Sequence, residues 1–157
     1  MKVPICKAAL TGAVICLSLG GASIAQAGTC SNASLKGKYG QTISGQLLPA
    51  PGVVIPQNGV AMSDFDGNGN FTQTDFVVIG GTPTNSAFQS EIGRYQINAD
   101  CTGTASFHYT DGTVIDLALV VVSEGRGFRT VVTSLLLYGT AVPANIGSSG
   151  TRVINAD

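Results

Sequence analysis

The fold class is set by two β-rich runs that flank a turn within residues 102–122, TGTASFHYTDGTVIDLALVVV. The runs, Thr102–Tyr109 and Thr113–Val122, are rich in the β-branched and aromatic residues typical of strands. Asp111-Gly112 lies between them and can supply the positive φ angles of a tight hairpin turn. The stretch therefore predicts an antiparallel hairpin, and no part of the sequence shows a sustained helical period.

Similar runs, separated by Gly, Asn, Asp and Pro, recur after the N-terminal segment. About eight strands at this spacing predict an all-β fold, a small antiparallel up-and-down barrel, with a β-sandwich as the alternative. Pro49–Pro56 and Gly80–Ala87 are expected to be long loops, and the tail from Pro143 to Gly150 has a flexible composition. The predicted strands are Gly37–Leu47, Gly59–Phe65, Asn70–Ile79, Ser90–Asn98, Thr102–Tyr109, Thr113–Val122, Gly127–Tyr138 and Gly150–Asn155.

Residues 1–27 have the features of a helical, cleavable signal peptide, which leaves residues 28–157 as a single barrel domain. Lys2 and Lys7 give a positive start, and Ala8–Leu19 is apolar but shorter than the about 20 residues of a membrane span. The small-x-small sequence at residues 25–27 predicts cleavage after Ala27, with an uncleaved anchor as the alternative. We therefore expect an exported protein, periplasmic or secreted, with no membrane span in its mature part.

Cysteine usage agrees with an oxidising compartment. The sequence has 4 cysteines, of which Cys6 and Cys16 lie in the signal peptide. Cys30 and Cys101 remain, and a single disulfide between them is the simplest expectation. Free thiols or half of a metal site are the alternatives, although the chain has only 1 histidine to complete a Cys/His site.

Composition narrows the classes of partner. The formal net charge is −1, and no run of basic residues occurs. Nucleic acid and anionic membrane surfaces are therefore not expected partners. Hydrophobic residues make up 44% of the chain, which is too many for a disordered protein.

Two predicted strands are apolar on both faces, and this is the main functional indication. Val114–Val122 and Thr130–Tyr138 are almost continuously apolar. In a barrel, one face can line the interior, but the other face must be covered by something else. We expect an exported barrel that binds an apolar small molecule. The alternative is a structural module of the cell envelope that associates with itself as a homo-oligomer.

Four residues have the spacing of a calcium loop. Asp64, Asp66 and Asn68 stand at alternate positions before Gly69. Asp75 is at the twelfth position counted from Asp64, which is the position of the last ligand in a calcium loop. Oxygen ligands gathered by a sharp turn are what calcium requires. However, a strand over residues 71–78 would carry Asp75 away from the turn, and the same residues also suit a plain hairpin. Calcium is therefore a possible cofactor, and no other cofactor is expected.

Four further residues are candidates for contact with a ligand. Tyr39 and Tyr95 follow Gly-Lys and Gly-Arg and could stack on a ligand or pack in the sheet. His108 is the sole histidine, and a role as general base would need a nucleophile and an acid nearby. Asp116 interrupts an apolar strand and either pairs with an arginine inside the barrel or faces solvent. We assign no catalytic residue.

Three stretches together resemble a family of uncharacterised secreted bacterial proteins with calycin-like barrels of the allene oxide cyclase type. The stretches are Cys30–Gly40, Asp64–Asn70, and Gly93–Tyr95 with Ala99–Thr104. The resemblance covers most of residues 28–157 and implies a barrel that can hold an apolar ligand. It makes a cyclase or isomerase a remote further alternative. No cyclase active-site residue matches a position in this chain, and a shared fold does not imply a shared activity.

Overall fold

The computed structural model describes residues 29–109 and 111–153. The predicted signal peptide, its cleavage after Ala27 and the end of the predicted last strand at Asn155 lie outside the described residues. No helix in residues 29–109 and 111–153 is long and apolar enough to cross a membrane.

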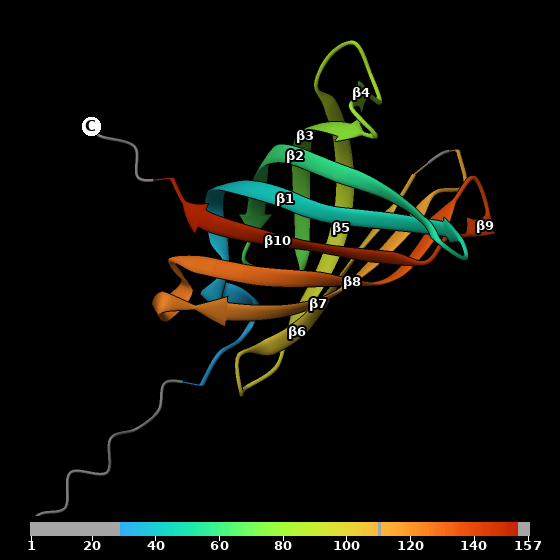
Figure 1. Ribbon diagram of the computed structural model, residues 1–157. Coiled ribbons are helices and arrows are strands. Elements are labelled where there is room, and N and C mark those ends of the chain that lie inside the picture. Colours follow the sequence, from blue (N-terminus) through green and yellow to red (C-terminus); the bar gives the residue numbers. More distant parts are fainter. Residues whose placement is uncertain (1–28, 110, 154–157) are drawn as a thin grey trace, which may run out of the picture.

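The eight long strands form a closed antiparallel barrel (Figure 1). Neighbours follow the order β10-β1-β2-β3-β5-β6-β7-β8, and β8 also pairs with β10, which closes the ring. The predicted barrel is confirmed, and the alternative, a β-sandwich, is excluded. The strands are β1 (Lys36–Ala50), β2 (Val53–Asp66), β3 (Asn70–Ile79), β5 (Gln89–Ile97), β6 (Thr102–His108), β7 (Val114–Val122), β8 (Gly127–Leu137) and β10 (Ala144–Arg152), with the two-residue strands β4 (Thr82–Pro83) and β9 (Thr140–Ala141) in loops.

Two predicted loops were wrong. The expected loop Pro49–Pro56 is mostly strand, because β1 and β2 continue to a turn at Pro51-Gly52. The expected flexible tail Pro143–Gly150 is also strand, since β10 starts at Ala144 and pairs with both β1 and β8. Its glycines have a packing role: a Cβ on Gly150 would lie 2.3 Å from the Phe128 ring. The glycine-rich composition of this segment therefore allows close packing against Phe128 rather than flexibility.

One end of the barrel is closed by an N-terminal plug. The plug consists of the 3-10 turn η1 (Asn32–Ser34) and Leu35, whose side chain is fully buried. Aromatic rings pack around Leu35 and fill this end of the barrel. The rings belong to Tyr39, Phe65, Phe71, Tyr95, Phe107 and Phe128. The cluster forms the floor of the barrel, which we call the closed end.

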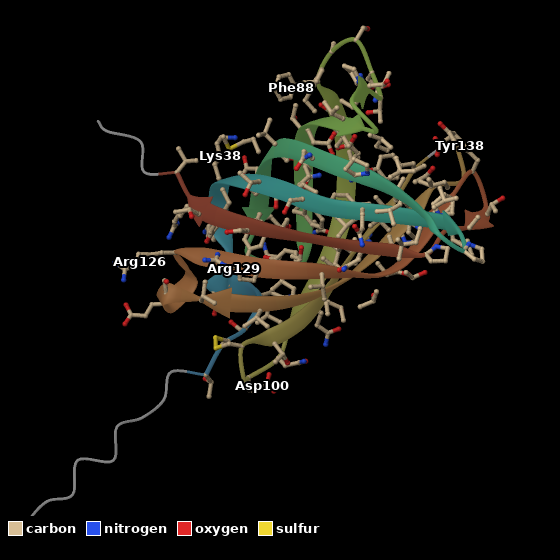
Figure 2. The ribbon with its side chains drawn as sticks, viewed as in Figure 1. Lys38, Phe88, Asp100, Arg126, Arg129 and Tyr138 are labelled. Carbon is tan, nitrogen blue, oxygen red and sulfur yellow. A yellow bond between two sulfur atoms is a disulfide. The ribbon has the colours of Figure 1, made fainter. Side chains whose placement is uncertain are left out.

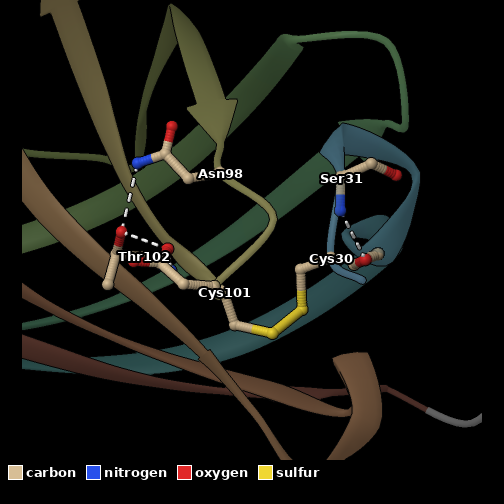
Figure 3. Close-up of a disulfide and its surroundings, with 7 residues drawn as sticks. Cys30, Ser31, Asn98, Cys101 and Thr102 are labelled. Carbon is tan, nitrogen blue, oxygen red and sulfur yellow. Dashed lines mark hydrogen bonds between the residues drawn. A yellow bond between two sulfur atoms is a disulfide. The ribbon is translucent and has the colours of Figure 1, made fainter. Parts of the chain in front are cut away.

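The disulfide holds the plug against the β5–β6 turn (Figure 3). Cys30 and Cys101 are bonded, with their Cα atoms 4.9 Å apart and a sequence separation of 71. The Cys30 amide also donates to the Ala99 carbonyl oxygen at 3.2 Å. The predicted disulfide is confirmed, and it joins the first described residues to the middle of the chain.

We predict that Cys30→Ser lowers the free energy of unfolding by about 4 kcal/mol, because the reduced chain regains the entropy of a long open loop. The measurement is urea unfolding of native protein and variant. Native protein treated with reductant should match the variant. Equal midpoints for the native, reduced and mutant proteins would contradict a stabilising role.

Candidate functional site

Above the aromatic floor, the barrel encloses a cavity of about 460 Å³. Strand residues that alternate toward the interior line it, because successive side chains in a strand point to opposite faces. The apolar part of the wall includes Phe71, Phe107, Leu119, Val132 and Leu135. The cavity extends toward the other end of the barrel, where the β1–β2, β3–β5, β6–β7 and β8–β10 loops lie (Figure 1). We call this the open end.

A chain of hydrogen-bonded polar side chains crosses the interior at mid-height. On β8 and β10, the Thr130 and Ser148 hydroxyls lie 2.7 Å apart, and Ser148 donates to Gln41 Oε1 at 3.3 Å. The amide group of Gln41 donates to Gln73, and Ser63 Oγ donates to Gln73 Oε1 at 3.0 Å. We call Thr130, Ser148, Gln41, Ser63 and Gln73 the polar belt of the barrel interior. Each of these side chains has a hydrogen-bond partner within the belt.

The belt ends at two carboxyl groups on neighbouring strands. Gln73 Nε2 donates to Asp75 Oδ2 at 3.0 Å on β3. Glu91 on β5 stands opposite Gln73 in the strand register, and it is 9% exposed. Glu91 Oε2 is buried and has no hydrogen-bond partner in the described part of the chain. An unpartnered buried carboxyl oxygen is costly, so this atom is the least satisfied point of the interior.

Burial alters the protonation of this pair. Burial, and secondarily the charge of Asp75, raises the pKa of Glu91 to about 7. Burial also raises the pKa of Asp75, partly offset by the hydrogen bond from Gln73. The pKa of the cavity-lining Tyr109 is raised chiefly by burial and then by Glu91, Asp75 and Asp111. The cavity therefore disfavours each added negative charge.

The two tyrosines predicted to contact a ligand belong to the closed end. Tyr39 is fully buried and its hydroxyl donates to the Gly125 carbonyl oxygen. Tyr95 is 5% exposed, and its Oη lies 2.9 Å from the carbonyl oxygens of Asn32 and Leu35. Both are part of the aromatic floor, and neither lines the cavity. A ligand contact by either tyrosine stays a prediction.

The other two predicted ligand residues meet on the outer surface of the barrel. Ser106 Oγ donates to Asp116 Oδ1 at 2.7 Å and lies 3.0 Å from His108 Nε2. Because the Ser106 hydroxyl donates its single hydrogen to Asp116, it can only accept a hydrogen bond from the histidine. The histidine therefore does not act as base toward the serine in this arrangement, and His108 itself is exposed. Neither His108 nor Asp116 lines the cavity.

The four predicted calcium ligands do not converge. Asp66 accepts from the amides of Asn68 and Asn70, which is hairpin-turn chemistry, and Asp64 forms an ion pair with Lys38 at 2.7 Å. β3 carries Asp75 into the barrel, where it stands opposite Ala61. No three His, Cys, Asp or Glu side chains within the described ranges could hold a metal ion together. Calcium binding by the remaining loop residues stays a prediction.

Glu91 was not singled out from the sequence, although a signal for it exists. On β5, Glu91, Gly93, Tyr95 and Ile97 alternate with exposed residues and are all buried. A strand whose buried face contains Tyr95 and Ile97 must also direct Glu91 inward, since the side-chain period is two. The alternation of buried and exposed residues therefore predicts that the Glu91 carboxyl group points into the barrel. It does not predict that Glu91 Oε2 lacks a hydrogen-bond partner.

Comparisons with known proteins support the fold. One solved structure, the S-type phycobiliprotein lyase CPES from Guillardia theta, aligns with a TM-score of 0.51. The alignment covers 79% of this chain and 91% of the lyase, at 9% sequence identity. No protein-family model and no curated protein matches the sequence. The chain therefore shares a calycin-like barrel with the lyase, and the suspected relation to allene oxide cyclase-type proteins stays a resemblance.

The raised pKa of Glu91 predicts that stability falls as the pH rises. The folded protein holds the Glu91 proton up to its raised pKa of about 7, whereas an unfolded glutamate releases its proton near the ordinary pKa of 4.5. The resulting stabilisation is fully present below pH 4.5 and is lost as the pH rises through about 7. With the screening of the charge by solvent taken into account, protonation of Glu91 contributes about 2 kcal/mol to the free energy of unfolding.

Urea unfolding at a series of pH values measures this effect. We expect Glu91→Gln to unfold at a higher urea concentration than native protein at pH 8 and to lose most of the slope between pH 5 and 8. Glu124→Gln is the matched control, because Glu124 is exposed on the outside of the barrel. An unchanged slope in Glu91→Gln would contradict the buried, proton-holding carboxyl group.

Proposed function

We propose that the protein is an exported barrel that binds an apolar small molecule in its interior cavity. The observation that carries the proposal is the cavity of about 460 Å³, which is within the range typical of ligand sites. Its wall combines many aliphatic and aromatic side chains with a few converging polar groups, which is also typical of such sites. The closed end gives the ligand a dry floor, and the opposite end gives it an entrance.

The fold and the disulfide add support of a general kind. The phycobiliprotein lyase has the same barrel architecture, which supports a barrel suited to small molecules without assigning a shared activity. A Cys30–Cys101 disulfide is the state expected in an oxidising compartment, which supports export. The signal peptide predicted at residues 1–27 remains the reason for proposing secretion.

A neutral fluorescent probe tests the proposed site. N-phenyl-1-naphthylamine fluoresces more strongly in apolar surroundings, and we expect native protein to bind it saturably. Val132 lines the cavity, so Val132→Trp should weaken binding about tenfold or more by filling the space. Val131 directly precedes Val132 on β8 and is 56% exposed, so Val131→Trp is the matched control.

The two variants separate the outcomes of this test. Loss of binding in Val132→Trp with retention in Val131→Trp supports the interior site. Equal binding by native protein and Val132→Trp would place the probe elsewhere. Absence of saturable binding to native protein would contradict the proposed function.

A second candidate function is self-association through the outer face of β7 and β8. Val120 and Val131 are 44% and 56% exposed, and they are diagonal neighbours on this face. A second copy of the chain would cover both. In sedimentation velocity, this function predicts an oligomer that Val131→Asp dissociates, and a monomeric native protein would contradict it.

A further inference from the structure

We infer that the ligand of the cavity carries a positively charged nitrogen on an apolar body, and that Glu91, with Asp75, binds that nitrogen. The inference rests on the proposed function and assigns a chemical class to its ligand. Four features of the interior support it.

The first feature is the unpartnered oxygen of Glu91. The side chain is more than nine-tenths buried, lines the cavity, and has an Oε2 atom with no donor in the described chain. Native proteins rarely leave such an atom unpaired without a reason. A ligand N–H group would complete its hydrogen bonding, and a charged donor would do so more strongly than a neutral one.

The second feature is that the side-chain amides of the polar belt are already engaged. The Gln73 side chain stands beside Glu91 in the register, but its amide group donates to Asp75. Gln41 donates to Ser63 at 3.0 Å and to Gln73. The polar belt therefore supplies hydrogen bonds up to Asp75 and stops before Glu91. The missing donor has to come from outside this belt.

The third feature is the distribution of charge around the cavity. The lining contains the carboxyl groups of Asp75, Glu91 and Asp111, and none of its described members is Lys, Arg or His. The described Lys and Arg residues all lie at or near the strand ends of the closed end, as Lys38, Arg126 and Arg129 do in Figure 2. They are Lys36, Lys38, Arg94, Arg126, Arg129 and Arg152. An anionic ligand would meet only like charges inside the barrel, whereas a cation would be attracted.

The fourth feature separates an organic cation from a metal ion. Calcium takes six to eight oxygen ligands, and no group of three acidic, His or Cys side chains in residues 29–109 and 111–153 could hold a metal. The cavity instead offers two carboxyl groups beside the rings of Phe107 and Tyr109. Carboxylates and aromatic rings together suit an alkylammonium or similar nitrogen. The aliphatic wall toward the open end suits its apolar body.

Three unbranched probes of ten carbon atoms each test the inference: decylamine, 1-decanol and decanoate. Isothermal titration calorimetry of native protein at pH 8 measures their affinities below the concentrations at which they form micelles. Decylamine is then cationic, decanol neutral and decanoate anionic. We expect decylamine to bind about tenfold more tightly than decanol, and decanoate to bind most weakly.

Glu91→Gln removes the charge and keeps the shape of the side chain. We expect this variant to lose the preference for decylamine, about a tenfold effect, while it binds decanol as native protein does. Glu124→Gln makes the same chemical change on the exposed outer surface and should keep the preference. An unchanged preference in Glu91→Gln would overturn the assignment of Glu91.

A pH comparison on native protein gives a readout that needs no variant. The Glu91 pKa of about 7 leaves this carboxyl ionised at pH 8 and protonated at pH 5. The other titratable groups that face it are Asp75 from β3, and Tyr109 and Asp111 from the segment after β6. Decylamine stays cationic at both pH values, so its advantage over decanol should decrease about tenfold at pH 5.

Failure of the inference and failure of the proposed function give different results. Binding of decanol or decanoate at least as tight as that of decylamine at pH 8 would overturn the inference and leave a binding barrel. Absence of binding by all three probes and by N-phenyl-1-naphthylamine would overturn both.

Discussion

The Tyr95 hydroxyl lies 2.9 Å from the carbonyl oxygens of both Asn32 and Leu35, and this contact holds the N-terminal plug inside the barrel. The plug brings Leu35 onto the aromatic floor and leaves its side chain with no exposed surface. The disulfide to Cys101 and the bond from the Ile97 amide to Asn32 Oδ1, 2.7 Å long, fix the same segment from outside the floor. Without this closure the barrel would be open at both ends, and water could enter from either side. The cavity therefore depends on a contact that lies outside it.

The polar belt divides the interior into two apolar regions. Below it lies the aromatic floor, and above it lies an aliphatic cluster around Leu47, Leu135 and Ile146. A fully satisfied polar network fixes the side chains that form it, whereas one unsatisfied member costs stability. The interior has both properties, because the Gln41 and Gln73 amides each donate and accept hydrogen bonds within the belt, while Glu91 Oε2 beside the belt has no partner in the described residues. Sites that contact ligands commonly contain such a locally unfavourable group.

Much of the barrel could be predicted from the sequence, because its strands alternate or are bounded by clear turns. Asn70–Ile79 was predicted with its observed limits, and the pairing of Cys30 with Cys101 followed from the count of available cysteines. Only the end of β10, from Gly150 onward, could be predicted as strand, because the Gly and Ser residues before it suggest a loop. The absence of a side chain at Gly150 instead allows Phe128 to pack against it. The cavity could not be predicted, because it depends on which side chains from several strands meet. Asp75 illustrates this: its spacing suggests a calcium loop, but the alternation of β3 places its side chain on the interior face beside Gln73, which pairs with Glu91 across the sheet.

The placement of charge gives the two ends of the barrel different chemistry. The cations of the described chain lie at or near the closed end, where Arg94 contacts Asn70 and Lys38 pairs with Asp64. The cavity contains carboxyl groups without a compensating cation among its described residues. If the interior served only as a core, an apolar residue at position 91 would be more stable, because it would need no hydrogen bond. A carboxyl group there is instead understandable as half of an interaction whose other half arrives with a ligand.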